Sequence, residues 1–519
     1  MDDSSSHVQT DCTSNVSEVT SESNASITGS GTTKTVKAAR MTLRGCISMF
    51  LLFLINLLNY TDRFTLAGVL TDIQKYFNLD DAKIGLLQTV FVIFYMLSAL
   101  ICGFLGDRYN RKWLVIFGIT LWVSAVFASS FVPEKFYYLF LSCRGALGFG
   151  EACYVTIVPS IIADMFVGNT RARALMFFYF AAPLGSGFGY IFGSYTNSLL
   201  NGWKWALRLT PIFSAICLIL FASIIREPGR GEAETATGAA AANQIETTSY
   251  WNDIVALLQI RTYVLATIAY TAVVFSMMSL SWWGPTSMCY AFAMNHDFNS
   301  TDDIDKQMKA EINFFFGLIT IIGGLAGVVV GSLWAQMWSG GKYCFRAVRT
   351  KRANALVCAI GSCMGAPLLF FGLRFMDGNM AVAWVFELFL HFHCNRSPLT
   401  ELQIFIFFTV TAMCLNFSIN VELCLDVVTP TRRNVANGLQ MFISNLLGGA
   451  VGPYTVGIVS DAIRGSDDRP TARFKGVLRA FYIINCVLLI SGLCYFLAAF
   501  FFTGDHTNFR KKMGESPHL

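Results

Sequence analysis

Four charged side chains lie inside stretches of sequence that are otherwise apolar. Asp62 and Arg63 lie in the stretch 47–70, and Arg144 and Glu151 lie in the stretch 136–162. A charge in a membrane-spanning helix is unfavourable unless it pairs with another charge or faces water, and such residues usually serve transport. A carboxylate can bind and release a proton, whereas an arginine can hold a carboxylate or another anion. The four residues therefore predict a working site inside a membrane.

The elements that would hold these residues are membrane-spanning helices. The chain has 519 residues, of which 54% are hydrophobic and 14% charged, and a helix of about 20 apolar residues crosses a bilayer. We expect an all-α membrane protein with twelve transmembrane helices in two six-helix halves. The predicted spans are 45–70, 84–106, 112–131, 136–163, 171–198, 204–226, 262–292, 309–338, 352–373, 401–428, 432–463 and 475–503.

A polar stretch with the low-complexity run 235–242 separates the sixth span from the seventh and predicts a linker. The first residues are rich in Ser and Thr and contain no apolar segment typical of a cleaved signal peptide. We expect five regions: a disordered cytoplasmic tail (1–44), an N-terminal six-helix half (45–226), a cytoplasmic linker (227–261), a C-terminal six-helix half (262–503) and a cytoplasmic C-terminal tail (504–519).

The basic residues predict the orientation. Clusters such as 107–112, 170–173 and 346–352 all fall in loops on one face of the predicted bundle. Because basic loops stay on the cytoplasmic side, this face, the linker and both termini are expected to be cytoplasmic. The sequon at Asn299 then lies in a luminal or extracellular loop, where it is a candidate for glycosylation.

The loop after the second span carries the most specific motif. Residues 103–112 read Gly-Phe-Leu-Gly-Asp-Arg-Tyr-Asn-Arg-Lys and resemble the signature of the major facilitator superfamily, whose fold we therefore expect. The resemblance implies that this motif latches the cytoplasmic side of one conformation; the alternative is a basic loop that only sets topology. The predicted cytoplasmic gate residues are Gly103, Gly106, Asp107, Arg108, Arg111 and Lys112.

Further segments are similar to the spinster family of lipid transporters, with a likeness that runs from about residue 45 to 505. They are 59–63, 144–152, 178–190, 203–208 and 430–433. The resemblance implies that Asp62 is the proton-coupling acid, that Arg63, Arg144 and Glu151 are its charge partners, and that Glu151 is a second acid. A permanent ion pair that only fixes helix packing is the alternative.

Depth along the helices indicates which of these charges could meet. At 1.5 Å per residue, Asp62 and Arg144 each lie roughly 12 Å from the luminal face, so the two could pair. Glu151 lies on nearly the same face of its helix as Arg144, about 10 Å deeper. We expect a charged ladder in which Arg63 or Arg144 meets the headgroup of the substrate.

The second half departs from the family pattern. Asn445 and Gly449 stand where members of the family usually carry His and Asp, so any function of those two residues is in doubt here. Glu422 keeps an acidic residue in the tenth span and is a candidate for a second-half site, with Asp426 one turn later. Trp282, Trp283 and the glycines of 185–189 and 323–327 could line an apolar cavity, although packing contacts between helices are the commoner use of such glycines.

These features predict a secondary active transporter that moves lysophospholipids or sphingolipids by alternating access, and we expect it to be coupled to protons. The alternative is a carrier of a soluble organic solute, drug or sugar. We expect no enzyme, because no nucleophile and base occur together in a span, and no catalytic residue, metal or cofactor. The phosphate-binding motif of ATP-driven pumps is missing, so a gradient would supply the energy. We expect a monomer in lysosomal or late endosomal membranes, or else the plasma membrane; the particular lipid and its direction stay open.

Overall fold

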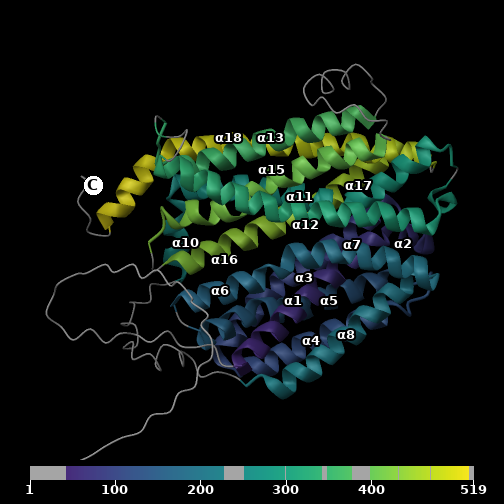
Figure 1. Cartoon of the computed structure of the whole chain (residues 1–519), viewed down its shortest axis with the longest axis horizontal. Helices are drawn as coiled ribbons and strands as arrows, with labels where there is room; N and C mark the ends of the chain where they lie inside the picture. Colours follow the sequence, from purple (N-terminus) through teal and green to yellow (C-terminus); the bar gives the residue numbers. More distant parts are fainter. Residues whose placement is uncertain are drawn as a thin grey trace, which may run out of the picture. The chain divides into compact units, whose positions relative to one another are not determined.

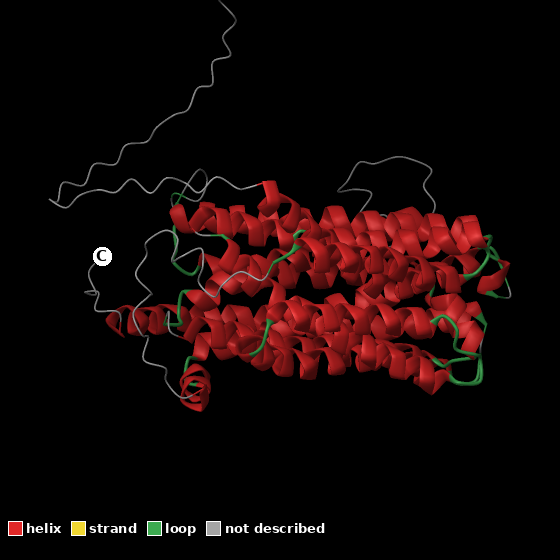
Figure 2. Cartoon of the chain, turned by 90° about the horizontal axis from the view of Figure 1, so that it is seen from below, coloured by secondary structure: helices red, strands yellow, loops and turns green. Residues whose placement is uncertain are grey.

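A computed structural model gives the architecture of the chain. It describes residues 43–166, 168–226, 250–298, 300–341, 346, 348–376, 398–429, 432–467 and 469–512. Within these residues every regular element is a helix (Figure 2). Twelve of the helices are long and apolar enough to cross a membrane. The number of spans predicted from the sequence is therefore confirmed.

The N-terminal half contains the first six spans and one short connecting helix. Leu, Ile, Val and Phe residues make up most of their buried faces, which belong to one apolar core shared with the other half. The helices are α1 (Leu43–Gly68), the connecting helix α2 (Leu70–Phe77), α3 (Asp81–Arg108), α4 (Arg111–Ser129), α5 (Tyr137–Met165), α6 (Gly168–Tyr179), α7 (Ala181–Leu200) and α8 (Trp203–Ile224).

The C-terminal half contains the other six spans, drawn in green to yellow in Figure 1. Its elements are α11 (Arg261–Asn295), the 3₁₀ turn η1 (Thr301–Asp303), α12 (Lys306–Gly340), α13 (Ala353–Met376), α15 (Pro398–Leu425), α16 (Arg433–Ile443), the π-helical segment η4 (Ser444–Ala450), α17 (Val451–Arg464) and α18 (Pro470–Lys512).

Two spans that the sequence predicts as single helices are interrupted. The fifth breaks at Phe180 into α6 and α7, and the eleventh contains η4 between α16 and α17. A proline follows each interruption. Pro183 has no amide hydrogen for the carbonyl group of Tyr179, and Pro453 has none for that of Gly449, so the regular hydrogen-bond ladder cannot continue.

The linker and the C-terminal tail contain helix that the sequence analysis missed. The linker, predicted over 227–261, includes α10 (Tyr250–Leu258), whose Asp253 lies 2.7 Å from the guanidinium of Arg432. The twelfth helix does not end at residue 503, because α18 continues to Lys512. His506, expected in the tail, lies in this extension, where its ring stacks on Phe502.

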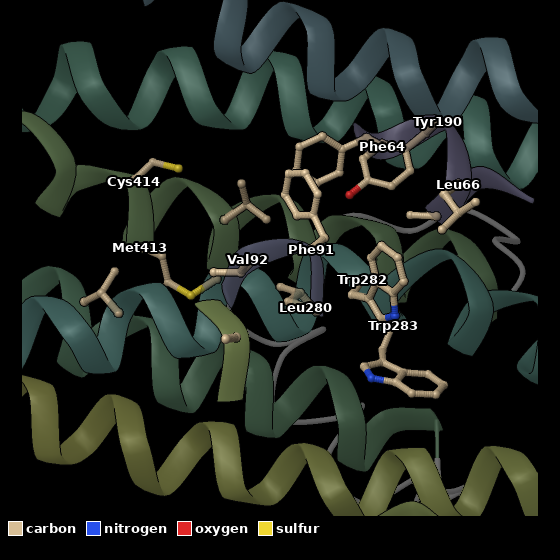
Figure 3. Packing of buried hydrophobic residues seen from close by; sticks show 14 of the residues in the cluster. Phe64, Leu66, Phe91, Val92, Tyr190, Leu280, Trp282, Trp283, Met413 and Cys414 are labelled. Atoms are coloured by element: carbon tan, nitrogen blue, oxygen red, sulfur yellow. The ribbon is translucent and has the colours of Figure 1, made fainter. Parts of the chain in front are cut away.

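Aromatic residues from both halves pack against one another where the halves meet (Figure 3). The hydroxyl of Tyr190 in α7 donates to the carbonyl of Ser281 in α11 at 2.6 Å, and the indole of Trp282 donates to the carbonyl of Ile84 in α3 at 3.2 Å. Trp282 and Trp283 are almost completely buried. They therefore act as packing residues, and not as the exposed wall of a cavity.

The glycines of 185–189 also serve packing. A β-carbon placed on Gly185 would lie 2.6 Å from the carbonyl oxygen of Leu57 in α1. Between the halves, a β-carbon on Gly187 would lie 2.6 Å from the carbonyl oxygen of Gly317 in α12, and one on Gly317 would lie 2.6 Å from that of Gly187. Small residues here allow the helix backbones to approach closely.

Polar contacts join the two halves at one end of the bundle, which we call the α2 end because α1 ends there and α3 begins there. Tyr290 of α11 donates to Gln74 of α2 at 2.6 Å, and Lys306 of α12 donates to Asn201 at 2.8 Å. Lys75 of α2 pairs with Asp302 of η1. The α2 end is therefore closed by side chains from both halves.

Candidate proton and anion site

The four intramembrane charges predicted from the sequence lie together in the N-terminal half. Asp62 and Arg63 come from α1, and Arg144 and Glu151 come from α5, with exposed fractions of 1%, 9%, 4% and 0%. Charges so deeply buried need nearby partners. The structure brings all four into one cluster, which we call the charge cluster.

The ion pair in this cluster is not the one that depth along the helices suggested. Arg63 donates to Oε2 of Glu151 at 2.7 Å. The guanidinium of Arg63 also lies over the rings of Phe91 and Tyr95, 4.7 and 5.0 Å from their centroids. The guanidinium of Arg63 is therefore held between the carboxylate of Glu151 and aromatic faces that favour a cation.

Asp62 faces a different helix. Its Oδ2 accepts a hydrogen bond from the indole nitrogen of Trp122 in α4 at 2.8 Å. Thr210 of α8 lies beside the same carboxyl group. The expected pairing of Asp62 with Arg144 is not the one in this structure, because consecutive residues on a helix point about 100° apart and only Arg63 is directed at α5.

Arg144 keeps unused hydrogen-bonding capacity although it is buried. Its Nε and Nη2 have no hydrogen-bond partner among the described residues, and its guanidinium lies 5.3 Å from the centroid of Phe91. Glu151, Arg63 and Asp62 act on it electrostatically. Buried donors without partners are unfavourable, so Arg144 is a member of the cluster with donors left for a further acceptor.

Three residues of the site were missed by the sequence analysis: Trp122, Thr210 and Asn59, which lies beside Glu151. Asn59 could have been found, because it precedes Asp62 by three residues and so shares its side of the helix. Trp122 gives a weaker signal, since tryptophan is common in membrane helices.

The motif at 103–112 sits at the opposite end of the bundle, which we call the basic end. Arg111 lies 2.7 Å from Asp164 of α5, and Lys112 donates to the carbonyl of Ala222 in α8 at 2.7 Å. A β-carbon on Gly106 would lie 3.3 Å from Ile157. Gly103 is packed less tightly, because a β-carbon there would lie 3.7 Å from the Cγ2 atom of Thr156. These contacts hold the motif against helices of its own half.

Comparison with known proteins agrees with this architecture. Residues 52–453 match the model of the Major Facilitator Superfamily. Protein spinster homolog 1 of Xenopus laevis is 38% identical over 463 residues, which cover 89% of this chain and 82% of the relative. The chain belongs to the spinster family. A second spinster relative, the sphingosine-1-phosphate transporter SPNS2 of Mus musculus, is 36% identical over 89% of this chain and 78% of its own length.

A solved structure shares the spinster fold. The crystal structure of a bacterial homologue of the human lysosomal transporter spinster, in an inward-facing and unoccupied conformation, superimposes with a TM-score of 0.72. It is 17% identical and the match covers 89% of this chain and 98% of the other. At this identity the likeness supports the fold of two six-helix halves and no more.

In this spinster chain the second-half candidates lie apart from the charge cluster. Glu422 is half-buried on α15, next to Asp426, which accepts a hydrogen bond from Asn354 of α13 at 3.2 Å. Asn445 and Gly449 both lie in η4, and the amide of Asn445 donates to the carbonyl of Met441 at 2.9 Å.

The side chains of three predicted site residues, Asn299, Asp107 and Arg108, lie outside the described part of the structure. Asn299 lies outside the described residues, and so does most of the N-terminal tail. The backbones of Asp107 and Arg108 belong to α3, but their side chains lie outside the description.

Proposed function

We propose that this protein is a secondary active transporter of lysophospholipids or sphingolipids, and that it couples lipid movement to protons. Its relatives support the class of substrate, since one of them is named as a sphingosine-1-phosphate transporter. The observation that carries the proposal is Arg144, a buried guanidinium with unpaired donors beside the carboxyl group of Asp62.

In this proposal the two residues divide the work. Arg144 binds the phosphate of an amphipathic lipid, because a guanidinium can form two parallel hydrogen bonds to phosphate oxygens. Asp62 binds a proton, since a carboxyl group shielded from water favours its neutral form and can release the proton when the site opens to water. Glu151 neutralises Arg63 and so keeps the net charge of the empty site low. Protonation of Asp62 then strengthens the local positive charge that attracts the lipid phosphate.

The distribution of basic residues supports one orientation of the closed structure in the membrane. Under the positive-inside rule the basic end, both termini and the linker are cytoplasmic, so the α2 end faces the lumen and Asn299 is a glycosylation candidate. In this orientation the structure is closed toward the lumen. The motif residues Arg111 and Lys112 would form the cytoplasmic gate in the other conformation. We place the monomeric protein in lysosomal or late endosomal membranes, with the plasma membrane as the alternative.

Transport into proteoliposomes tests the proposal. The purified protein is reconstituted with an imposed pH gradient and offered a panel of lysophospholipids and sphingolipids. We expect uptake that depends on the gradient, and we expect Asp62→Asn to lose this dependence. Arg144→Ala should lose uptake of phosphate-containing lipids but keep more of its uptake of sphingosine, which has no phosphate. The matched control is Asp467→Asn, which replaces a carboxylate that pairs with Arg469 in a loop between α17 and α18.

Two outcomes contradict the proposal. Unchanged coupling in Asp62→Asn removes the proton site. Competition by sugars or nucleosides, with no lipid taken up, favours a carrier of soluble solutes instead.

A further inference from the structure

Trp122 is tightly packed next to the proposed proton site. Its side chain is completely buried in α4. Gly150 of α5 makes the close approach of these helices possible, because a β-carbon there would lie 2.6 Å from the backbone nitrogen of Trp122 and 2.9 Å from its Cβ. The indole ring is therefore fixed by backbone packing on one side and aimed at Asp62 on the other.

The hydrogen bond from Trp122 distinguishes the two oxygens of the Asp62 carboxyl group. Oδ2 accepts from the indole nitrogen at 2.8 Å, whereas Oδ1 is buried and has no partner among the described residues. An indole nitrogen only donates, so it can keep this bond in both protonation states provided that the proton sits on the other oxygen. Oδ1 is the oxygen that stays open to a proton.

The charged groups around Asp62 leave this arrangement intact. Arg144 and Glu151 of α5 act on it electrostatically, and Arg63 beside it is bound to Glu151. Helix α7, which packs along α1, contains no acidic or basic residue. On α8, Lys204 donates to Tyr76 and Arg208 donates to Ser130, so neither is directed at Asp62.

We propose that Trp122 is a positioning residue for proton coupling: it holds Oδ2 of Asp62, directs the proton to Oδ1 and keeps the carboxyl group hydrogen-bonded to α4. This inference rests on the proposed function, in which Asp62 is the proton site. It adds an indole donor to a site that already holds four charged residues and the neutral side chains of Thr210 and Asn59. Because the donor cannot itself take or lose a proton, the site titrates through Asp62 and leaves Arg144 available to the lipid.

The test replaces Trp122 with Phe, which keeps a ring and removes the N–H group. The purified protein is titrated by infrared spectroscopy, following the carbonyl band of protonated Asp62, which is assigned as the band missing in Asp62→Asn. Gradient-driven lipid uptake is measured over the same pH range. The control is Trp283→Phe, which removes a comparable buried hydrogen bond, 2.9 Å long, to the carbonyl of Pro453.

We expect the midpoint of the infrared band and the midpoint of uptake to move together to higher pH in Trp122→Phe, by about one to two pH units, because a hydrogen bond to a charged group is lost. Lipid exchange without a gradient should persist. If Trp122→Phe does not fold, benzothienylalanine at position 122 keeps the bicyclic shape without the N–H group.

The outcomes separate the two proposals. Midpoints that stay in place in the Trp122 variants, with a band that still depends on Asp62, overturn the positioning role alone. A shift as large in Trp283→Phe also overturns it. Gradient-driven uptake that survives Asp62→Asn overturns the proposed coupling, whereas the infrared titration still decides whether Trp122 holds the carboxyl group.

Discussion

Asp461 of α17 caps the first turn of α3, a helix of the other half. Its Oδ1 accepts from the backbone N–H of Asp81 at 3.1 Å, and its Oδ2 accepts from that of Ala82 at 2.7 Å. Asp81 returns the contact, because its Oδ2 accepts from Ser460 at 2.7 Å and its Oδ1 lies 3.3 Å from Arg473. A helix N-terminus and its capping carboxylate here belong to different halves, so the cap exists only while the α2 end is closed.

Replacing Asp461 with Ala should therefore open the α2 end. A cap of this kind stabilises a helix by about 1 kcal/mol, and here that energy favours the closed state. Hydrogen exchange followed by mass spectrometry should show faster exchange at the start of α3. Asp467→Ala, in the same region but paired locally, should leave the exchange unchanged. Equal exchange in the two variants would mean that the cap does not hold the halves together.

Replacing one partner of the Arg63–Glu151 pair should destabilise the protein more than replacing both partners. Glu151→Gln leaves a buried guanidinium without its carboxylate, and we expect a loss of about 3 to 5 kcal/mol in the free energy of unfolding. The double variant Arg63→Met with Glu151→Met should recover most of this loss, since it buries no charge. Thermal unfolding in detergent measures both. A double variant no more stable than Glu151→Gln contradicts this account.

Closure of the α2 end should depend on pH through Asp72. Burial raises the pKa of this carboxyl group above its ordinary value, and the charge of Lys309 partly offsets that effect. The closed state therefore binds more protons than an open state in which Asp72 is solvated. Acidification through the window above the ordinary value of about 3.9 should favour closure, and the benefit is lost as pH rises through the raised pKa.

Energy transfer between dyes at the exposed positions Lys135 and Ser466 follows this closure, because the two loops lie at the α2 end in different halves. The closed fraction should rise as pH falls, and this rise should be smaller in Asp72→Asn. Asp302, another carboxyl group at the α2 end, serves as the comparison because its pKa is shifted in the opposite direction. Burial opposes its ionisation, but the hydrogen bond and charge of Lys75 outweigh it and hold the pKa of Asp302 below its usual range. Its contribution should disappear only in strong acid, below the range in which Asp72 acts.

The sequence predicted the spans well because hydrophobic length is a local property. The number of spans is confirmed, and Asp62, Arg63, Arg144 and Glu151 do lie together. The pairing within the cluster was predicted less well. Depth was counted along each helix, whereas the partner of a side chain also depends on how the helix is rotated about its axis. Rotation is decided by packing, here by the close approach of α4 and α5 at Gly150, which no single segment encodes.

The interruptions of the fifth and eleventh spans show a second limit. Pro183 and Pro453 are visible in the sequence, but a proline in a membrane helix can produce a kink, a break or a π-helical segment. Neighbouring helices decide which of these forms. The helical extension of α18 to Lys512 was missed for a related reason, because residues 504–512 are polar and look like a tail until His506 packs on Phe502.

The reciprocal contact between Gly187 and Gly317 has a mechanical consequence. Backbone meets backbone there, without a side chain from either residue in between. The two glycines thus let α7 and α12 approach closely, with the side chains of Ile321 and Ile191 packed beside the contact. Such a contact fixes the distance between α7 and α12 more firmly than their angle, and we expect any rocking of the halves to pivot close to it.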